Sequence, residues 1–418
     1  MEERITTRCC VAGGGPAGMM LGFLLARMGV DVIVLEKHAD FLRDFRGDTV
    51  HPSTLQLMHE LGLLEDLLKL PHQEVRELSA EVGHESARVA DFTHVPTHCK
   101  FVALMPQWDF LDFLKANVLR YPAFHLKMQA EVTDVITEDG AAIGIRGKSP
   151  EGTFEIRAGL TVGADGRHSV VRKTAGLDVI DLGAPMDVMW MRLSRHPGDP
   201  AQTFGHAEAG KILVMLNRET YWQVALVIPK GEADEVKGRG LDAFRQEFAS
   251  LQPFLNDRVQ ELTDWKQVSL LTVAVDRLRN WSRRGLLCIG DAAHAMSPIG
   301  GVGINLAIQD AVAAANILGP ILRERAPTEA ELANVQRRRE FPTKATQRLQ
   351  IAVQNRVIRK VLGSAQPLKL PWAMKLLDRW ELLRRIPARI LGVGFRPEHI
   401  HTPDIHTPDI HAPNVGAR

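Results

Sequence analysis

A glycine-rich segment near the start of the chain has the residue types and the spacing needed to hold a dinucleotide. Residues 13–18 read Gly-Gly-Gly-Pro-Ala-Gly, and Glu36 follows 18 residues after the last glycine. Gly13 permits a tight turn, Gly15 lets the backbone approach a pyrophosphate, and Gly18 lets the following helix pack closely. The helix N-terminus offers free N–H groups to phosphates, and Glu36 can accept hydrogen bonds from ribose hydroxyls. The alternative is a glycine turn in another kind of α/β protein. The dinucleotide contacts predicted here are Gly13, Gly15, Pro16, Ala17, Gly18, Glu36 and Lys37.

The segments on either side of this motif support the dinucleotide prediction. Residues 8–12 are a short apolar run, residues 19–28 are rich in Leu, Met and Ala, and residues 30–35 are apolar and β-branched. The order of strand, glycine turn, helix and strand is the βαβ unit in which the glycine motif carries meaning. The motif alone does not distinguish FAD from NAD.

Two later segments favour FAD. A β-type run at residues 160–162 leads into Gly-Ala-Asp-Gly at 163–166, and an apolar run at residues 285–289 leads into Gly290-Asp291. After the second segment, a glycine loop opens a long Ala-rich helix that reaches about residue 322. An acid at the carboxyl end of a parallel strand, followed by a glycine loop and a helix, is a natural ligand site in an α/β sheet.

The chemistry of these residues suits a flavin. Asp291 is placed to hold a polyol such as the ribityl chain. The backbone N–H groups of Gly303 to Asn305, at the start of the long helix, can stabilise negative charge on a reduced isoalloxazine.

In these three motifs the chain resembles the class A flavoprotein monooxygenases, the para-hydroxybenzoate hydroxylase family. Residues 13–18 resemble the family's dinucleotide fingerprint, residues 163–166 its Asp-Gly motif, and residues 290–298 its Gly-Asp motif. The motifs occur in family order, so the resemblance spans residues 8–322. It implies an α/β fold with a doubly wound, glutathione reductase-like Rossmann domain that binds FAD. An antiparallel β-sheet substrate domain and a helical C-terminus complete the expected architecture.

The resemblance also implies roles for single residues. Arg46 matches the arginine that contacts FAD where the flavin swings, and Gln107 matches a polar residue near the ribityl chain. Pro298 matches the proline whose backbone faces the flavin C4a region, and Arg46 and Pro298 are the predicted catalytic residues. Ser297 departs from the family pattern, because many relatives carry a second proline there. The other predicted FAD contacts are Val132, Asp165, Gly290, Asp291, Gly301, Gly303, Ile304 and Asn305.

The predicted domains are not continuous in sequence. The FAD-binding domain is expected to comprise residues 1–73, 101–180 and 283–336, and the substrate-binding β-sheet domain residues 74–100 and 181–282. A basic helical region at 337–400 and an extended tail at 401–418 follow. Long β-type runs between residues 181 and 282 indicate the antiparallel sheet. The candidate pocket residues are Trp190, Phe204, Met215 and Trp222, and the alternative for each is an ordinary core position.

The reaction that the resemblance implies has two halves. NADH or NADPH reduces FAD, with the flavin swung outward; then O2 gives a C4a-hydroperoxide that hydroxylates an electron-rich aromatic compound. The alternative is an FAD-dependent reductase of the geranylgeranyl reductase kind, which does not use O2. A flavin-dependent halogenase is disfavoured because its Trp-x-Trp-x-Ile-Pro signature is missing, and a flavin-free interaction protein because the motifs are intact. The motifs do not identify the substrate.

Composition excludes several other classes. The 418 residues carry a net charge of +1, so no overall field favours nucleic acid, and four cysteines do not make a disulfide framework. Neither a signal peptide nor a membrane span is recognisable, so we expect a cytoplasmic monomer or homodimer. His168 and His294 lie inside motifs and are interpreted as structural residues. Three histidines in the tail at a spacing of five offer a weak zinc hypothesis, and an extended tail is the better interpretation.

Charge is concentrated near the C-terminus. Residues 337–396 contain 15 Lys and Arg against 3 Asp and Glu. Trp372, Leu376, Trp380 and Leu383 have the spacing of one helix face. Such a basic amphipathic helix can dock on an anionic membrane surface, cover the FAD domain or form a dimer interface, and the sequence leaves these three open.

Overall fold

The first β–α–β unit is formed by β1 (Glu3–Ala12), α1 (Pro16–Arg27) and β2 (Val32–Leu35). The computed structural model describes residues 3–42, 49–200 and 203–406. β1 and β2 pair in parallel from Cys9 opposite Val32 to Ala12 opposite Leu35. Both strands are buried at these positions, which explains their continuous apolar sequences.

Segments distant in sequence complete a parallel sheet around this unit. Its core order is β8–β2–β1–β11–β20, and every neighbouring pair in this order is parallel. The added strands are β8 (Phe124–Lys127), β11 (Gly152–Gly163) and β20 (Leu286–Cys288), with β19 (Ser282–Arg283) antiparallel at the edge. A hairpin of β9 (Glu131–Glu138) and β10 (Ala141–Ser149) pairs with the first half of β11. Together with the helices, this is the predicted doubly wound α/β fold.

Long helices cover this sheet. α1 packs against α4 (Gln107–Val118) and α8 (Gly303–Glu324), and α8 packs against α9 (Glu329–Val353). In the described part of the chain, only Ile299–Glu324 is long and apolar enough to cross a membrane, and 72% of its most apolar window is buried inside the protein. α8 is therefore the central core helix of this domain.

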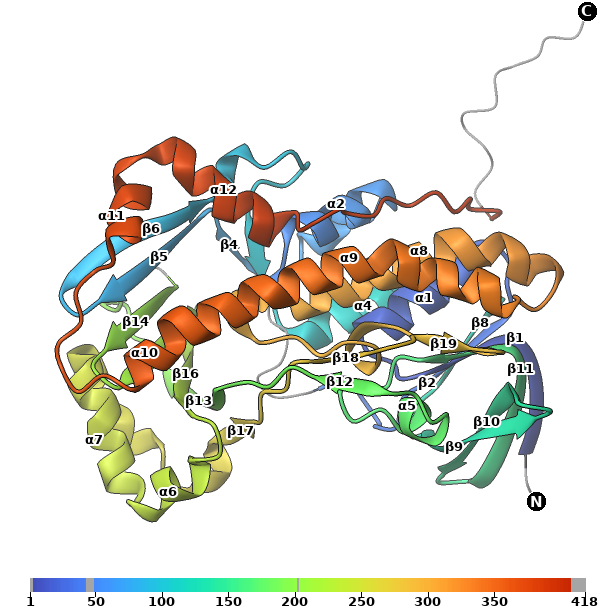
Figure 1. Ribbon diagram of the computed structural model, residues 1–418, viewed down its shortest axis with the longest axis horizontal. Helices are drawn as coiled ribbons and strands as arrows, with labels where there is room; N and C mark the ends of the chain where they lie inside the picture. The colour runs from blue at the N-terminus through green and yellow to red at the C-terminus, as the bar shows by residue number, and fades with distance from the viewer. Residues whose placement is uncertain (1–2, 43–48, 201–202, 407–418) are drawn as a thin grey trace, which may run out of the picture.

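A second sheet of seven strands lies beside the first domain (Figure 1). Neighbouring strands are antiparallel except for β14 and β5, which are parallel. One face packs against α6 (Ala233–Gly238) and α7 (Leu241–Leu251), and the other meets Ile299 and α10 (Arg359–Leu362). In sheet order, the strands are β17 (Ser269–Leu271), β13 (Met186–Ser194), β16 (Tyr221–Pro229), β15 (Lys211–Asn217), β14 (Phe204–Glu208), β5 (Glu77–Val82) and β6 (Glu85–Asp91).

Smaller elements join the two parts. The short sheet order β3–β7–β4 and the pair β12–β18 lie among the loops. The bounds are β3 (Thr49–Val50), β4 (Gln73–Val75), β7 (Val102–Leu104), β12 (Val179–Asp181), β18 (Asp276–Leu278), α2 (Pro52–Glu60), α3 (Leu64–Leu67) and α5 (Val170–Thr174). The short 3₁₀ turns are Phe92–His94, Pro253–Leu255, Val259–Glu261, Trp265–Gln267, Gly290–Ala292 and Ile299–Gly301.

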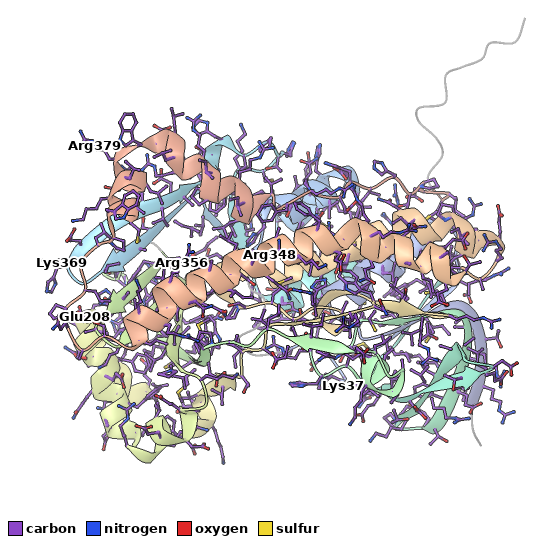
Figure 2. The ribbon with its side chains drawn as sticks, viewed as in Figure 1. Lys37, Glu208, Arg348, Arg356, Lys369 and Arg379 are labelled. Atoms are coloured by element: carbon purple, nitrogen blue, oxygen red, sulfur yellow. The ribbon has the colours of Figure 1, made fainter. Side chains whose placement is uncertain are left out.

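α9 continues through one π-helical stretch (Gln354–Ile358) into α10, and the three form one rod that crosses both sheets (Figure 1). Arg348 and Arg356 lie on the outer side of this rod (Figure 2). A buried row of glutamines lies on the inner side and is described below.

The chain then forms α11 (Trp372–Arg379) and α12 (Glu381–Gly392). The prediction that Trp372 and Leu383 share one continuous helix face is wrong, because Trp380 has an extended backbone (φ −118°, ψ 103°) and separates the two helices. The break lets each helix pack on the second sheet separately: Met374 of α11 packs against the cluster that contains Val82, and Ala388 of α12 packs in a cluster with Phe92.

The tail after α12 returns to the first domain without regular secondary structure up to residue 406. Arg27 donates a hydrogen bond to the carbonyl of Thr402 (2.8 Å) and pairs with Asp404 (3.3 Å). Tyr121 donates to the same carboxylate (2.9 Å). The described part of the predicted extended tail is therefore bound to the protein surface, and the last of the three histidines, His411, lies outside the described residues.

Candidate active site at the carboxyl edge of the parallel sheet

The carboxyl ends of β1, β2, β11 and β20 meet at one edge of the sheet. Backbone hydrogen bonds join the loops there: Gly13 N–H donates to the Leu35 carbonyl (2.8 Å), and Ala164 N–H donates to that of Ala12 (2.8 Å). Gly13 has a φ of +107°, and a Cβ there would lie 2.4 Å from the Ala164 oxygen. The parallel topology thus brings the three sequence motifs together, as ligand sites in open α/β sheets require.

The glycine turn has the shape that a pyrophosphate needs. A Cβ on Gly18 would lie 1.9 Å from the Gly13 oxygen, so this glycine is required for packing of α1. A Cβ on Gly15 would meet no protein atom within 4 Å, so open space lies before this residue. Pro16 begins α1, and no side chain caps the helix N-terminus. Its unpaired N–H groups and positive dipole end therefore face a space that phosphate oxygens fit.

Glu36 is held beside this turn. Its carboxylate accepts hydrogen bonds from Gly14 N–H (3.2 Å) and from His38 N–H (3.0 Å). Lys37 is exposed next to it, and Ala130 N–H donates to the Glu36 carbonyl (2.9 Å). Val132 follows two residues later on β9 and is buried. This arrangement places three predicted FAD contacts, Glu36, Lys37 and Val132, in one neighbourhood.

The carboxylate of Asp165 is directed to α5. It accepts hydrogen bonds from the Ser169 hydroxyl (2.5 Å) and from Val171 N–H (3.1 Å). Burial raises the pKa of Asp165 above its usual value, although these hydrogen bonds oppose the shift. In this structure the side chain therefore orders the start of α5.

Asp291 is more accessible. It follows β20 in a 3₁₀ turn, and one third of its side chain is exposed (33%). Arg167, which belongs to the Gly163–Gly166 motif region, places Nη2 3.7 Å from Asp291 Oδ2. A carboxylate positioned by a neighbouring cation at the edge of the sheet can accept hydrogen bonds from a polyol. Sequence reasoning missed Arg167, although it directly follows that motif.

A buried ion-pair network lies beneath the Gly290 turn. Asp310 of α8 accepts hydrogen bonds from Gly290 N–H (3.1 Å) and Arg339 Nε (2.9 Å), and its carboxylate lies 2.6 Å from His294 Nε2. Burial alone would raise the pKa of Asp310, but His294 and Arg339 hold it below its usual value. Arg339 also pairs with Glu398 of the tail (3.2 Å). His294 is thus part of the buried scaffold, in line with its structural interpretation.

The loop after Pro298 is fixed to β3 and α2. Gly301 has a φ of +63°, and a Cβ there would lie 2.3 Å from Thr49 Oγ1. The Asn305 amide nitrogen donates to the carbonyls of Thr49 (3.1 Å) and Gly301 (3.2 Å), and its oxygen accepts from His51 N–H (2.9 Å). The side chain of Asn305 is therefore used inside the protein. No side chain caps α8, so the first N–H groups, from Gly303 on, remain available to a ligand.

A family model described as FAD binding domain matches residues 6–349. The chain belongs to the class A FAD-dependent monooxygenases. Its cofactor is FAD, and NAD(P)H is the reductant typical of the family.

The monooxygenase is 33% identical to 6-methylpretetramide 4-monooxygenase of Streptomyces rimosus over 387 residues, which are 92% of each chain. It is 25% identical to para-nitrophenol 4-monooxygenase of Pseudomonas sp. strain WBC-3, covering 79% of this chain and 82% of the relative. Its fold matches the crystal structure of p-nitrophenol 4-monooxygenase PnpA from Pseudomonas putida DLL-E4, with a TM-score of 0.74 at 19% identity, over 92% and 97% of the two chains. These relatives support the monooxygenase prediction and not the reductase alternative.

A row of buried glutamines on α9 and at the start of the following π-helical stretch holds the Pro298 loop of the monooxygenase. Gln350 accepts a hydrogen bond from Ser297 N–H (3.2 Å) and donates to the carbonyls of Ser297 (2.9 Å) and Ile299 (3.0 Å). Gln354 donates to the Ser297 hydroxyl (2.9 Å), and Gln347 donates to the Ala295 carbonyl (3.2 Å). Sequence reasoning missed these residues, because glutamines on a helix usually face solvent.

Three of the four predicted pocket residues lie on the face of the second sheet that α6 and α7 cover. Phe204, Met215 and Trp222 pack in the core with α6 and α7. Side chains alternate along strands, so Trp190 points to the opposite face, where it packs in one cluster with Ile299 of the Pro298 loop. The core alternative was therefore right for Phe204, Met215 and Trp222. Among the described residues, no acceptor lies within hydrogen-bonding distance of the buried Trp190 Nε1.

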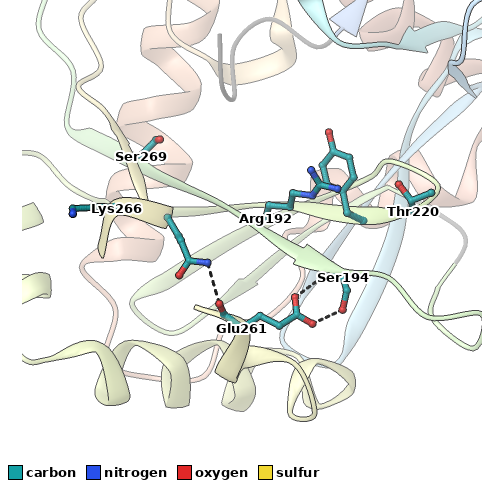
Figure 3. A pocket seen from close by; sticks show the side chains of 8 residues that line it. Arg192, Ser194, Thr220, Glu261, Lys266 and Ser269 are labelled. Carbon is teal, nitrogen blue, oxygen red and sulfur yellow. Dashed lines mark hydrogen bonds between the residues drawn. The ribbon is translucent and has the colours of Figure 1, made fainter. Parts of the chain in front are cut away.

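A surface pocket of about 420 Å³ opens at the end of this same face (Figure 3). Arg192, two residues beyond Trp190 on β13, lies with its guanidinium 3.9 Å from the centre of the Tyr221 ring. Glu261 accepts a hydrogen bond from Ser194 N–H (2.8 Å) and another from its hydroxyl, so its carboxylate ties the end of β13 to the neighbouring loop (Figure 3). Cationic and hydroxyl side chains thus border the outer end of the sheet face that carries Trp190.

The remaining predicted site residues have different positions. Gln107 is the first residue of α4 and is half-buried. Pro298 is half-buried immediately before the 3₁₀ turn that carries Ile299. Arg46 lies outside the described residues.

Proposed function

We propose that this monooxygenase hydroxylates a phenolic compound with several fused aromatic rings, of the aromatic polyketide kind. The observation that carries the substrate class is the 33% identity to 6-methylpretetramide 4-monooxygenase across nearly the whole of both chains. The single-ring nitrophenol relative is less similar over a smaller part of the chain. The buried indole N–H of Trp190 has no acceptor among the described residues. It could therefore donate a hydrogen bond to a phenol or carbonyl oxygen of the substrate.

The residues at the carboxyl edge would hold FAD in an extended arrangement. Glu36, Lys37 and Val132 would contact the adenosine, and Gly13 to Gly18 the pyrophosphate. Asp291 would accept hydrogen bonds from the ribityl hydroxyls, with Gln107 nearby, and the α8 N-terminus at Gly303 would stabilise negative charge on the flavin. When bound, FAD would accept electrons from NAD(P)H and activate O2.

The remaining contacts follow from the loops at this edge. The contribution of Asp165 would come from the backbone of its turn, since its carboxylate is engaged with α5. Pro298, Gly301 and Ile304 would face the flavin ring, and Arg46 would contact the flavin as in the family. The first sheet would thus form the FAD-binding domain, and the second would cover the substrate with the face that carries Trp190.

The reaction can be tested directly with the purified protein. NADH and NADPH oxidation and O2 uptake are followed with phenols of one to four rings, and products are analysed by mass spectrometry under ¹⁸O₂. We expect one ¹⁸O atom in the product and the largest stimulation of turnover by a compound with fused rings. Stimulation by single-ring phenols alone would overturn the substrate class, and turnover without O2 uptake would overturn the monooxygenase function.

The protein is also proposed to act in the cytoplasm, as a monomer or homodimer. All four cysteines are free and buried, which suits a reducing compartment. Burial raises the pKa of the Cys9 and Cys288 thiols, so these residues act as small apolar side chains. Contact with a membrane surface is a separate matter that rests on the C-terminal helices.

A further inference from the structure

The α11–α12 surface exposes an unusual amount of apolar area. Within residues 372–386, five large apolar side chains are between 41% and 78% exposed: Trp372, Leu376, Trp380, Leu382 and Ile386. Single exposed apolar residues are normal on soluble proteins, whereas clusters of this kind mark interaction sites. Both helices contact β6 with their other side, so the exposed side chains face away from the body of the protein.

The two helices repeat one pattern. On α11, Trp372, Leu376 and Arg379 follow the spacing i, i+4, i+7, and on α12 Leu382, Ile386 and Arg389 follow the same spacing. Each helix therefore carries two exposed apolar side chains and one exposed arginine along a single face.

The net charge of residues 372–392 is +3, from five Lys and Arg against two Asp and Glu, and both carboxylates already pair with arginines. Asp378 accepts hydrogen bonds from the backbone N–H (3.1 Å) and guanidinium of Arg88, and Glu381 pairs with Arg385 (3.1 Å). In the part of the chain that the structure describes, no carboxylate lies within ion-pair distance of Arg379, Arg389 or Lys369. Arg379 and Lys369 extend from the outer edge of the molecule (Figure 2).

We propose that α11 and α12 dock the monooxygenase on an anionic lipid bilayer. Tryptophan is favoured at the boundary between acyl chains and headgroups, and arginine stems can extend from an apolar face to lipid phosphates. A basic amphipathic helix pair of this kind lies in the plane of the interface. A second copy of the chain fits less well, because a twofold interface through this surface would bring identical cationic groups close together. The proposal does not depend on the identity of the substrate.

The test is sedimentation of the full-length, FAD-loaded protein with vesicles. Vesicles of phosphatidylcholine alone are compared with equimolar phosphatidylcholine and phosphatidylglycerol, at low and high salt. We expect binding to the anionic vesicles, weak binding to the neutral ones, and release by salt. Replacement of both tryptophans (Trp372→Ala with Trp380→Ala) should weaken partitioning roughly tenfold, and Arg379→Gln with Arg389→Gln should remove the preference for anionic lipid.

A matched control separates this surface from general adhesion to vesicles. Leu119 and Leu270 are 56% and 43% exposed on other elements, and Leu119→Ala with Leu270→Ala should leave vesicle binding unchanged. FAD content and thermal unfolding show that each variant is folded. Absence of binding to anionic vesicles would overturn the proposal, as would binding that the double tryptophan variant retains. A dimer in sedimentation velocity that this variant dissociates, without vesicle binding, would assign the surface to a second copy instead.

Discussion

The backbone N–H of Ser297 donates a hydrogen bond to the side-chain oxygen of Gln350, at a distance of 3.2 Å. Many members of the family carry proline at the position of Ser297, and proline has no N–H to donate. The departure from the family pattern therefore corresponds to a specific contact between the Pro298 loop and α9. Gln354 adds a second contact, to the Ser297 hydroxyl.

This relationship predicts the effect of restoring the family residue. Ser297→Pro removes both the N–H that donates to Gln350 and the hydroxyl that accepts from Gln354. Two hydrogen bonds worth about 1 kcal/mol each correspond to about thirtyfold in the population of the native loop position. We expect more hydrogen peroxide and less hydroxylated product for each NAD(P)H oxidised, and Gln350→Leu should act similarly. The double variant should be little worse than either single one. Gln336→Leu is the control, because Gln336 lies on the same helix but accepts its hydrogen bond from Trp281 N–H. Fully additive effects at 297 and 350 would refute the coupling.

Two glycines of the same motif should respond differently to alanine. In Gly15→Ala the new methyl group meets no protein atom, so the unfolding temperature of the FAD-free protein should stay unchanged. FAD affinity should fall by about tenfold or more, because the methyl group enters the space for the pyrophosphate. Gly18→Ala should instead destabilise the FAD-free protein by about 1–3 kcal/mol, since its methyl group would overlap the Gly13 oxygen. Fluorescence titration with FAD and calorimetry measure both effects, and normal FAD binding by Gly15→Ala would contradict the proposed site.

The two tryptophans on opposite faces of the second sheet form another matched pair. Trp190→Phe should cost little stability, because the lost indole N–H has no acceptor among the described residues. It should change the substrate KM or the position of hydroxylation. Trp222→Phe should lower stability by about 1–3 kcal/mol and leave the KM unchanged, because Trp222 is fully buried and donates to Asp199 (2.9 Å). A change of KM with Trp222→Phe and none with Trp190→Phe would reverse the assignment of the faces.

The Asp310 network should make stability depend on pH. The pKa of Asp310 is lowered in the folded protein, so the ionised carboxylate stabilises the folded state relative to the unfolded one. This contribution is present above the unfolded-state pKa of about 3.9 and is lost as the pH falls through the folded-state value. Asp310→Asn should therefore cost about 3 kcal/mol at neutral pH, because Arg339 and His294 lose a buried anion. The difference from the native protein, measured by urea unfolding of the FAD-free form, should shrink only in strong acid. A difference that grows on acidification would contradict this account.

Much of the fold was predictable because it depends on local patterns. The apolar runs around Gly13 and the glycines at 290 and 301 define the parallel sheet and its carboxyl edge, and the structure brings these segments together as expected. The β-type runs between residues 181 and 282 also predicted the antiparallel strands of the second sheet. Which set of alternating residues packs against α6 and α7 was not predicted, and Phe204, Met215 and Trp222, offered as pocket residues, belong to that packed set.

Other features depended on long-range contacts that no local pattern records. Asp165 lies in the expected turn, but hydrogen bonds to Ser169 and Val171 show that its carboxylate serves α5. The buried face of α9 is polar, because Gln350 satisfies backbone groups of a loop about 50 residues earlier, and helical periodicity alone assigns such residues to solvent. The helix break at Trp380 accompanies the packing of both α11 and α12 on β6.

The position of Glu398 has a consequence for the biosynthesis of this protein. This residue closes the ion-pair network that begins at the Gly290 turn, although β1 and the glycine motif are synthesised almost 400 residues earlier. Domains commonly fold in order as they leave the ribosome. Here the nascent chain can form its first β–α–β unit early but cannot complete the scaffold beneath the Gly290 turn until Glu398 has been added. We therefore expect ribosome-bound chains that stop before this residue to retain FAD poorly.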